Sequence, residues 1–416
     1  MPSRLSPVWM SALVVVIAAS CGLTDTVSRG EIVIATEFPT TGAFGAGGRQ
    51  AEAGVAYALR EVGSIRGFKL VHVPYEDSLN GFYDAELGAR NFAQIVDDPR
   101  VVAVIGPFNS DVARVSIPIT NKAELALISP STTHPCLTRE LPACGARPRG
   151  FGYTPASLRD QGRPNNYFRI APRDDLQASA MADLAIDTLR ITRVAVWSDT
   201  LTIGLMYADT FSKRFEARGG TVVLRQDFEP FVAKDFTPFL RRAKEAGAEA
   251  IYTGANPSTG GCAARAQSKG ILDVYYLGTD EISSDACIKD AGDQATDRVL
   301  RTDDYAVASK DPANRGLIDA FKKAFPQNDD LGAFTFHGYD AARVLIDALG
   351  RAIDAAGGKM PTRRQVLDAV QNTKNLKLST GTYTFDANGD ATAPTIAFYQ
   401  VKNGVWTFFQ QSPVAP

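Results

Sequence analysis

The chain has 416 residues, of which 45% are hydrophobic, 22% charged and 9% aromatic. These proportions are those of an ordinary folded protein, and they argue against a disordered chain, a collagen-like repeat and a protein with many membrane spans. Lys plus Arg number 44 and Asp plus Glu number 46, so the net charge is −2, and neither sign forms a long run. Nucleic acid is therefore not expected as a partner.

The first 20 residues have the order of an export signal. A short segment carrying Arg4 precedes an apolar run from Trp9 to Ala19, which is too short for an ordinary membrane span. The stretch that ends at Cys21 resembles a bacterial lipobox, in which the cysteine is acylated and anchors the protein by burying acyl chains. A plain signal peptide with an unmodified Cys21 is the alternative, because one arginine makes a weak basic segment. Both interpretations predict export.

From residue 31 the chain alternates short apolar runs with amphipathic stretches, which is the pattern of βα units around parallel sheets. The first series has predicted strands at 32–35, 69–73, 101–105 and 125–129, with helices at 48–61, 84–97 and 111–123. The segment 139–166 is rich in Gly, Pro and Arg, has no usable periodicity, and is predicted to be a loop.

A second series follows this loop. Its predicted strands are 167–170, 194–197, 221–226, 250–253 and 274–277, with helices near 175–190, 204–218, 235–246 and 261–269. The remainder has predicted helices at 313–325, 334–356 and 361–371, then strands at 381–386, 394–402 and 404–409. Asn-Gly pairs at 388–389 and 403–404 suit hairpin turns. Two open α/β sheets predict a cleft between two lobes, with ligand-binding loops at the carboxyl ends of strands.

The cysteine count fits an oxidising compartment. Besides Cys21 there are four: Cys136 and Cys144 are eight apart, and Cys262 and Cys287 bracket one helix–strand unit. An even number of cysteines in an exported chain predicts two local disulfides. A four-cysteine metal site is the alternative, but these spacings are not those of a zinc ribbon or knuckle.

The first candidate loop, 39–48, is rich in glycine and opens a helix. From Gly45 the sixth place is Gln50, so the dinucleotide fingerprint is incomplete, and no phosphate-loop Gly-Lys-Ser/Thr follows. A flexible turn before a helix explains the individual glycines. No cofactor is predicted here.

Two other loops place hydroxyls and free backbone N–H groups at the head of a helix or turn. They are 106–111, with Ser110, and 130–135, with three consecutive hydroxyl residues. Such positions favour an anion, for example a carboxylate. The alternative is that Ser110 or Asp111 only caps a helix. In the second series, Asp280 follows a strand and offers an acceptor for a cationic group, although it too could be a cap.

The sequence contains few residues in patterns typical of catalysis. The three histidines, His72, His134 and His337, are scattered without metal-ligand spacing, and no Gly-x-Ser-x-Gly elbow is present. His134 adjoins the hydroxyl loop and could contact a ligand. A secreted enzyme, which needs a positioned nucleophile and base, is therefore the least favoured hypothesis, and no metal is expected.

The order of these motifs resembles the leucine/isoleucine/valine-binding family of type I periplasmic binding proteins. The similar segments are TTGAFG, VIGPFNS, ISPSTT, GTDE and a late GYDAARVL, and they cover nearly the whole chain after the signal. The resemblance implies that the two hydroxyl loops bind an α-carboxylate and that a strand-end acid of the second lobe binds an α-ammonium. Carried over, the carboxylate residues are Ser110, Ser131, Thr132 and Thr133, and the ammonium residue is Asp280.

The side-chain pocket departs from the family. Members that bind branched amino acids place aromatic rings where this chain has Gly47, Ile203 and Asn256. Phe44 and Phe108 are candidates to replace those rings in part. The resemblance therefore implies a conserved grip on an amino acid and a changed specificity.

The resemblance also implies the fold and the partners. The fold is two doubly wound parallel-sheet lobes joined by a three-strand hinge near 167–169, 299–303 and the hairpin after Phe385. Lobe 1 is predicted at 31–167 with 303–392, and lobe 2 at 168–302 with 393–416. The function is a monomeric substrate-binding component of an ABC importer, which closes around an amino-acid-like ligand and presents it to a permease. A sensor of the same fold is the alternative. The membrane contact would be the lipid anchor alone.

Overall fold

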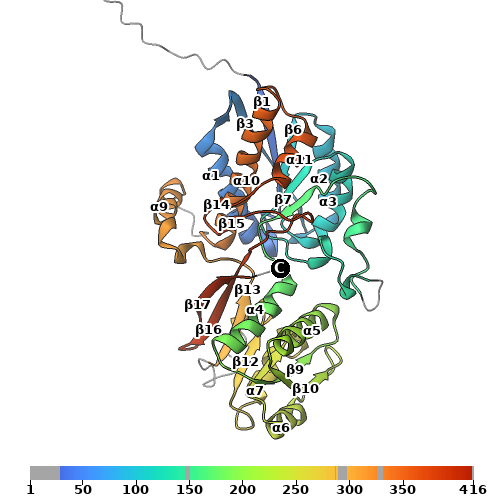
Figure 1. Cartoon of the computed structure of the whole chain (residues 1–416), viewed down its shortest axis with the longest axis vertical. Helices are drawn as coiled ribbons and strands as arrows, with labels where there is room; N and C mark the ends of the chain where they lie inside the picture. The colour runs from blue at the N-terminus through green and yellow to red at the C-terminus, as the bar shows by residue number, and fades with distance from the viewer. Residues whose placement is uncertain (1–28, 146–149, 286, 289–297, 326–330, 415–416) are drawn as a thin grey trace, which may run out of the picture.

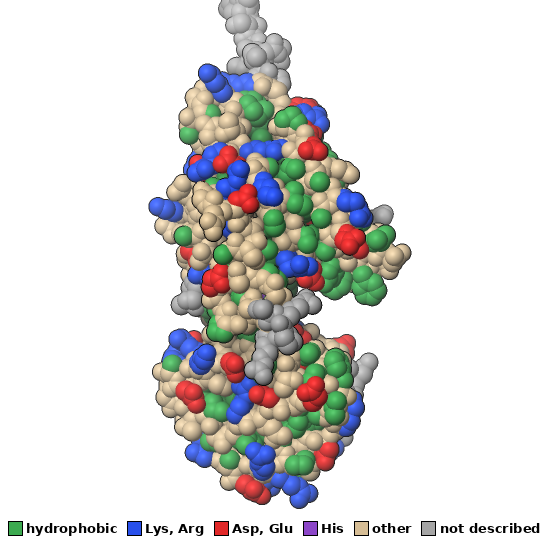
Figure 2. All heavy atoms as spheres, turned by 90° about the vertical axis from the view of Figure 1, so that its right-hand side faces the viewer, with side chains coloured by type: hydrophobic (Ala, Val, Ile, Leu, Met, Phe, Trp, Pro, Cys, Tyr) green, Lys and Arg blue, Asp and Glu red, His purple; other side chains and the backbone are tan. Residues whose placement is uncertain are grey.

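The computed structural model describes residues 29–414 except 146–149, 286, 289–297 and 326–330. The chain forms two α/β lobes stacked along its long axis, with β1, β3 and β6 in one lobe and β9, β10 and β12 in the other (Figure 1). A space-filling view shows the lobes as two masses, with charges of both signs dispersed over each (Figure 2). The predicted two-lobed α/β fold is confirmed.

The first lobe is built on a six-stranded sheet in the order β2-β3-β1-β6-β7-β8. All neighbours are parallel except β2 and β3. The strands are β1 (Glu31–Phe38), β2 (Ser64–Ile65), β3 (Phe68–Glu76), β6 (Val101–Ile105), β7 (Ala126–Ser129) and β8 (Tyr167–Arg169). Every residue of β1 after Glu31 is buried, as expected where helices cover both faces of a sheet.

The helices of the first lobe are α1 (Gly45–Val62), α2 (Ala85–Asp97), α3 (Ser110–Lys122), α9 (Arg315–Ala324), α10 (Ala333–Ala355) and α11 (Arg363–Gln371). The local sequence explains where several of these helices begin. The Asp84 carboxylate accepts from the Leu87 amide at 2.6 Å before α2, and Thr362 and Gln365 form a capping box before α11. Two short hairpins, β4 (Ser78–Leu79) with β5 (Phe82–Tyr83) and β14 (Leu376–Lys377) with β15 (Thr382–Tyr383), were not predicted as pairs.

The second lobe has a seven-stranded sheet in the order β10-β9-β11-β12-β13-β16-β17. Its strands are β9 (Arg193–Ser198), β10 (Thr221–Asp227), β11 (Ala250–Thr253), β12 (Tyr275–Gly278), β13 (Val299–Asp303), β16 (Thr395–Lys402) and β17 (Val405–Pro413). Its helices are α4 (Asp174–Asp187), α5 (Thr202–Ala217), α6 (Thr237–Glu245) and α7 (Gly261–Gln267). The predicted turn at 403–404 joins β16 to β17, with both residues at positive φ.

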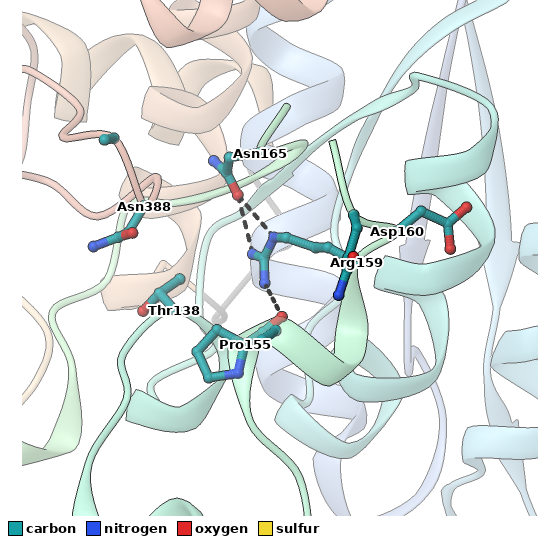
Figure 3. A pocket seen from close by; sticks show the side chains of 9 residues that line it. Thr138, Pro155, Arg159, Asp160, Asn165 and Asn388 are labelled. Atoms are coloured by element: carbon teal, nitrogen blue, oxygen red, sulfur yellow. Dashed lines mark hydrogen bonds between the residues drawn. The ribbon is translucent and has the colours of Figure 1, made fainter. Parts of the chain in front are cut away.

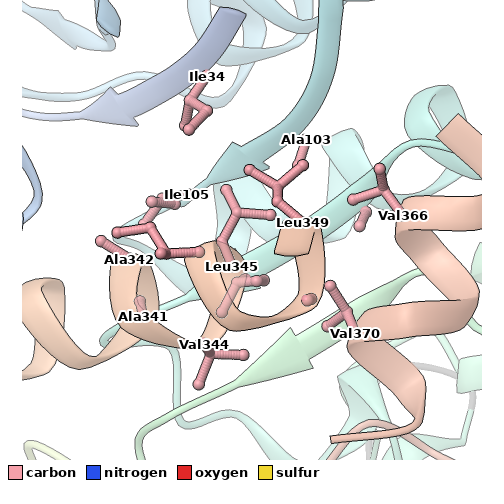
Figure 4. Close-up of a cluster of buried hydrophobic side chains, with 14 of the residues drawn as sticks. Ile34, Ala103, Ile105, Ala341, Ala342, Val344, Leu345, Leu349, Val366 and Val370 are labelled. Carbon is pink, nitrogen blue, oxygen red and sulfur yellow. The ribbon is translucent and has the colours of Figure 1, made fainter. Parts of the chain in front are cut away.

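The core of the first lobe lies between its sheet and the C-terminal helices. Ile34, Ala103 and Ile105 from β1 and β6 face Leu345 and Leu349 of α10, and side chains of α11 complete the cluster (Figure 4). All five of these side chains are fully buried. Because α10 is about 300 residues from β1 in sequence, this contact is what makes the lobe discontinuous along the chain.

Two sequence-based predictions need correction. The strand at 167–170 was assigned to the second series, but β8 pairs with β7 in the first sheet, with Leu127 opposite Tyr167. Periodicity identifies a strand and not the sheet that it joins. The predicted strand 381–386 shortens to β15, because beyond Tyr383 only Phe385 keeps a partner, through an isolated bridge to Ala391. The chain passes between the sheets three times: after β8, after β13 and before β16.

A buried ion network joins two of these passages. Asp390, in the last one, accepts from Arg169 of β8 at 2.8 Å and from Arg173 at the start of α4 at 3.1 Å. Arg139 of the 139–166 loop also bonds Asp390, at 2.8 Å, and pairs with Asp386. Although burial opposes ionisation, these arginines lower the pKa of Asp390 to about 2. The network therefore ties the loop to the junction between lobes.

Both predicted disulfides form, Cys136 to Cys144 and Cys262 to Cys287. The first closes the start of the 139–166 loop, whose described part holds only two short 3₁₀ turns, at Pro142–Cys144 and Pro155–Leu158. The predicted signal segment and Cys21 lie outside the described residues. Among the residues that are described, no helix is long and apolar enough to cross a bilayer.

Candidate functional site

A cavity of about 350 Å³ lies at the carboxyl ends of the first-lobe strands. Its walls come from the loops after β1, β6 and β7, from the chain after β13 and from the start of α10. Five of the site residues predicted from the sequence line this cavity: Phe44, Phe108, Ser110, Ser131 and Thr133. Ala43, Gly47, Asn109, Tyr305 and Phe334 complete the wall.

The N-terminus of α3 opens onto this cavity without a side-chain cap. The cap position is held by Asn109, which makes no capping hydrogen bond, and its Oδ1 is buried without a hydrogen-bond partner among the described residues. Ser110 Oγ accepts from the His134 amide at 3.3 Å, and Asp111 accepts from the Tyr83 hydroxyl at 3.2 Å. Neither Ser110 nor Asp111 is the cap, so the first-turn N–H groups stay available to an anion.

The three hydroxyl residues in the loop after β7 do not all reach the cavity. Ser131 Oγ donates to the Phe108 carbonyl at 2.7 Å and lines the cavity. Thr132 is 1% exposed, donates to Ser129 Oγ at 2.8 Å and bonds the Tyr167 hydroxyl, so the structure does not bring it to the cavity. Thr133 lines the wall, and its carbonyl accepts from the Asp174 amide at 3.0 Å.

Aromatic rings form the apolar side of the cavity. The Phe108 ring centroid lies 4.8 Å from that of Phe334, which lies 4.4 Å from Tyr305. A Cβ at Gly47 would come within 2.7 Å of the tip of Phe108, so glycine there leaves the space that this ring uses. Phe334 and Tyr305 were missed because they lie far along the chain, although the strand-end rule applied after 299–303 points to Tyr305.

Asp280 stands at the end of β12 in the second lobe. Gln177 of α4 donates to it at 2.8 Å and Tyr207 of α5 at 3.5 Å, and the Gln177 carbonyl oxygen accepts from Thr302 at 2.8 Å, which orients the amide. The capping residue of the following 3₁₀ turn is Thr279, so Asp280 is not the cap. Burial raises the pKa of Asp280, and Asp303 adds to that shift.

Ile203 and Asn256 do not line the first-lobe cavity. Asn256 follows β11 and caps the 3₁₀ turn Pro257–Thr259, accepting from the Ser258 amide at 3.0 Å. Ile203 lies in the first turn of α5 and packs on the second-lobe core. Both follow strand ends of the second lobe, where a ligand would meet them only when the lobes approach.

The histidines make no catalytic arrangement. His134 Nδ1 accepts from the Cys136 amide and the Tyr153 hydroxyl, and burial lowers its pKa to about 3. Burial also lowers the pKa of His337 to about 4, and His72 bonds Thr36 and Glu52. Within the described part of the chain, no group of three or more His, Cys, Asp and Glu is placed to hold a metal ion.

A separate cavity of about 260 Å³ lies beside the 139–166 loop and shares no lining residue with the first (Figure 3). The Arg159 guanidinium at its centre donates to Asn165 Oδ1 at 3.0 Å and to the carbonyls of Leu137 and Pro155. The arginine therefore holds the loop against β8, whose Tyr167 carbonyl accepts from Asn165. This cavity is not part of the candidate site.

Two sheet-based lobes with a lined cavity at strand ends define the class of two-lobed small-molecule binding proteins. A sequence profile of the family described as "Periplasmic binding protein" matches residues 31–405. A Leu/Ile/Val-binding protein homologue of Brucella melitensis is 26% identical over 393 residues, which is 94% of this chain and 96% of the homologue. The Leu/Ile/Val-binding protein BraC3 of Rhizobium johnstonii is also 26% identical, over 91% of this chain and 93% of BraC3.

Solved structures support the same family. The crystal structure of a leucine-binding protein from Thermotoga maritima superposes with a TM-score of 0.64 at 25% identity, covering 92% of this chain and 98% of that one. The chain belongs to the periplasmic binding protein family, whose members bind solutes and are not enzymes. The predicted resemblance to type I, leucine/isoleucine/valine-binding members is confirmed.

Proposed function

We propose that this protein is the lipid-anchored, extracytoplasmic substrate-binding component of an ABC importer and binds an amino acid or amino-acid-like molecule between its lobes. The observation that carries the proposal is that hydrogen-bond donors stand at strand ends of the first lobe and a buried carboxyl group stands at a strand end of the second. The uncapped α3 N-terminus and the Ser131–Thr133 loop offer hydrogen-bond donors on one side, and Asp280 offers a carboxylate on the other. The names of the relatives support the same ligand class.

In this proposal the α-carboxylate accepts from first-turn N–H groups of α3 and from the hydroxyls of Ser110 and Thr133, whereas Ser131, whose hydroxyl donates to the Phe108 carbonyl, lines the wall. The α-ammonium donates to Asp280, which Gln177 already holds in place. A ligand bound to both lobes favours the closed form by its extra contacts there, and the hinge passages let the lobes move. Thr132 is left out of this set because its hydroxyl is committed to Ser129 and Tyr167.

The test is a ligand screen followed by titration. The mature protein is heated with amino acids, short amides, ureas and aromatic acids, and any binder raises the melting temperature by mass action. Isothermal titration calorimetry then gives the affinity of each binder. Binding of zwitterionic amino acids supports the proposal, and binding of aromatic acids or amides without any amino acid contradicts it.

The anchor and the partner need separate measurements. Metabolic labelling with a fatty acid should mark the wild-type protein, and Cys21→Ala should lose the label and be released from membranes. Deletion of a neighbouring permease gene should abolish uptake of the identified ligand. Unimpaired uptake in that deletion would favour the sensor. Light scattering should give one chain per particle.

A further inference from the structure

Part of the 139–166 loop, which follows the first sheet, packs on the second lobe. Leu141, Ala143 and Phe151 are half-buried, and all three lie against the hydrophobic core of the second lobe. That core includes one face of α5, toward which the loop descends from the first lobe in Figure 1. We call residues 141–144, together with Phe151, the strap. The strap adds a contact between the lobes to the three passages of the chain.

Hydrogen bonds within the loop give the strap a defined shape. The Cys144 amide donates to the Leu141 carbonyl at 2.9 Å, which closes the 3₁₀ turn. The Phe151 amide donates to the Ala143 carbonyl at 2.9 Å, so the two sides of the loop support each other.

Covalent, aromatic and polar contacts fasten the strap to the first lobe. Cys144 is bonded to Cys136, which is fully buried and lies just beyond the hydroxyl residues of the loop after β7. The Phe151 ring meets His134 edge-on, with the ring centroids 4.0 Å apart. Arg139 belongs to the buried ion network at the junction between the lobes. The strap is therefore fixed in the first lobe, and movement between the lobes changes its contact with α5.

The strap and α5 leave an unfilled space between them. A cavity of about 280 Å³ lies there, with Leu141, Pro142 and Ala143 on the strap side. Leu205 and Met206 belong to its α5 wall. Protein interiors are packed without spaces of this size, and apolar surface gains free energy when it leaves water. A closer approach of the strap to α5 would therefore be favourable.

The strap also links two elements that carry proposed ligand residues. Ser131 and Thr133, which line the first-lobe cavity, precede the strap in the same stretch of chain after β7. In the second lobe, Tyr207 of α5 donates to Asp280 at 3.5 Å. Binding in the cleft and the contact between strap and α5 thus depend on the same relative position of the lobes.

We propose that the strap settles into the cavity on α5 as the lobes close, and that this apolar contact favours the closed form and raises the affinity for the ligand. The contact itself needs no ligand, whereas the effect on affinity rests on the proposed function. The apparent dissociation constant is the intrinsic one divided by the populated fraction of the binding form, so a strap that populates the closed form strengthens binding.

Small-angle X-ray scattering of the ligand-free mature protein tests the contact by itself. Leu141→Ser on the strap and Leu205→Ser on α5 should each increase the radius of gyration, because the lobes open more often. Leu79→Ser, at an exposed leucine of β4, is the matched control and should leave the radius unchanged. Circular dichroism and melting temperature verify the fold of each variant. A parent-like radius in both strap and α5 variants overturns the inference.

Calorimetry then tests the effect on affinity through a double-mutant cycle. The probe is the amino acid that gives the largest thermal shift in the ligand screen, starting with L-leucine. Leu141→Ser and Leu205→Ser should each weaken binding about threefold or more, and the double variant should lose less than the product of the two losses. Parent-like affinity, or losses that multiply fully, overturns the inference. If no amino acid binds, the proposed function fails, and the scattering comparison still decides on the strap.

Discussion

The two sides of the site differ in chemistry. The first-lobe wall is neutral: it offers the backbone of α3, hydroxyls and the rings of Phe108 and Phe334. The second-lobe wall is acidic, with Asp280 held by Gln177 and further carboxyl groups beside it. The comparison indicates that charge fixes the orientation of a ligand, whereas the neutral wall sets its shape. Each prediction below changes one wall and leaves the other intact.

The largest expected effect is at the acidic wall. Asp280→Ala removes the acceptor of a charge-assisted contact and should weaken binding of the cognate ligand by about 2–5 kcal/mol in calorimetry. The exposed Asp235→Ala serves as control and should leave the affinity unchanged. Parent-like affinity in Asp280→Ala would falsify the ammonium assignment.

The acidic wall should also make stability depend on pH. The pKa of Asp174 is raised to about 7 and that of Glu281 to about 8, mainly by burial, so the folded protein keeps protons that the unfolded chain has released. The buried His134 and His337, whose pKa values are lowered, offset this effect below about pH 6.5, so stability falls mainly as pH rises from about 6.5 toward 8. Each kcal/mol lost lowers the melting temperature by about 2–4 °C.

Differential scanning fluorimetry without ligand, from pH 5 to 8.5, measures this slope. Asp174→Asn removes one of the titrating groups and should flatten the curve. A melting temperature that rises steadily across this range would contradict the assignment of the raised pKa values.

On the neutral wall, Thr133→Val should weaken binding by about 1–3 kcal/mol, because a carboxylate oxygen loses a donor. Thr133→Ser keeps the hydroxyl and is the matched control. If calorimetry finds the same affinity for the Thr133→Val and Thr133→Ser variants, Thr133 is not part of the binding site.

Gly47 tests the shape of the same wall. In Gly47→Ala the new methyl would lie 2.7 Å from the tip of Phe108, so the ring must move from its place in the cavity wall. We expect a loss of about 1 kcal/mol in binding, measured by calorimetry. Gly316→Ala, where nothing lies within 4 Å of the new Cβ, should have no effect.

The smallest effect on overall affinity is expected at Ile203. Ile203→Tyr adds a ring at the second-lobe position where the resemblance to branched amino acid binders implies one. It should change the ranking of ligand side chains in a thermal-shift panel while the total affinity moves by less than about 1 kcal/mol. An unchanged ranking would place Ile203 outside the ligand's reach.

Much of the site could be located from sequence because strand ends are easy to find. The loops containing Phe44, Ser110 and Ser131 follow predicted strands directly, and all three line the cavity. Thr132 stands between two lining residues and yet turns to Tyr167 of β8, a contact about 35 residues away that loop composition does not reveal. Phe334 and Tyr305 likewise reach the cavity only through the return of the chain to the first lobe.

The sequence by itself determined the elements, the disulfide partners and the position of the hydroxyl loops, because periodicity, cysteine spacing and turn residues are local signals. Only the tertiary structure decided that β8 joins the first sheet and that α10 fills its core. It also decided that Asp174, Glu281 and Asp304 gather beside Asp280. Charge repulsion, burial and sheet membership depend on distances between distant segments, and those distances exist only once the chain has folded.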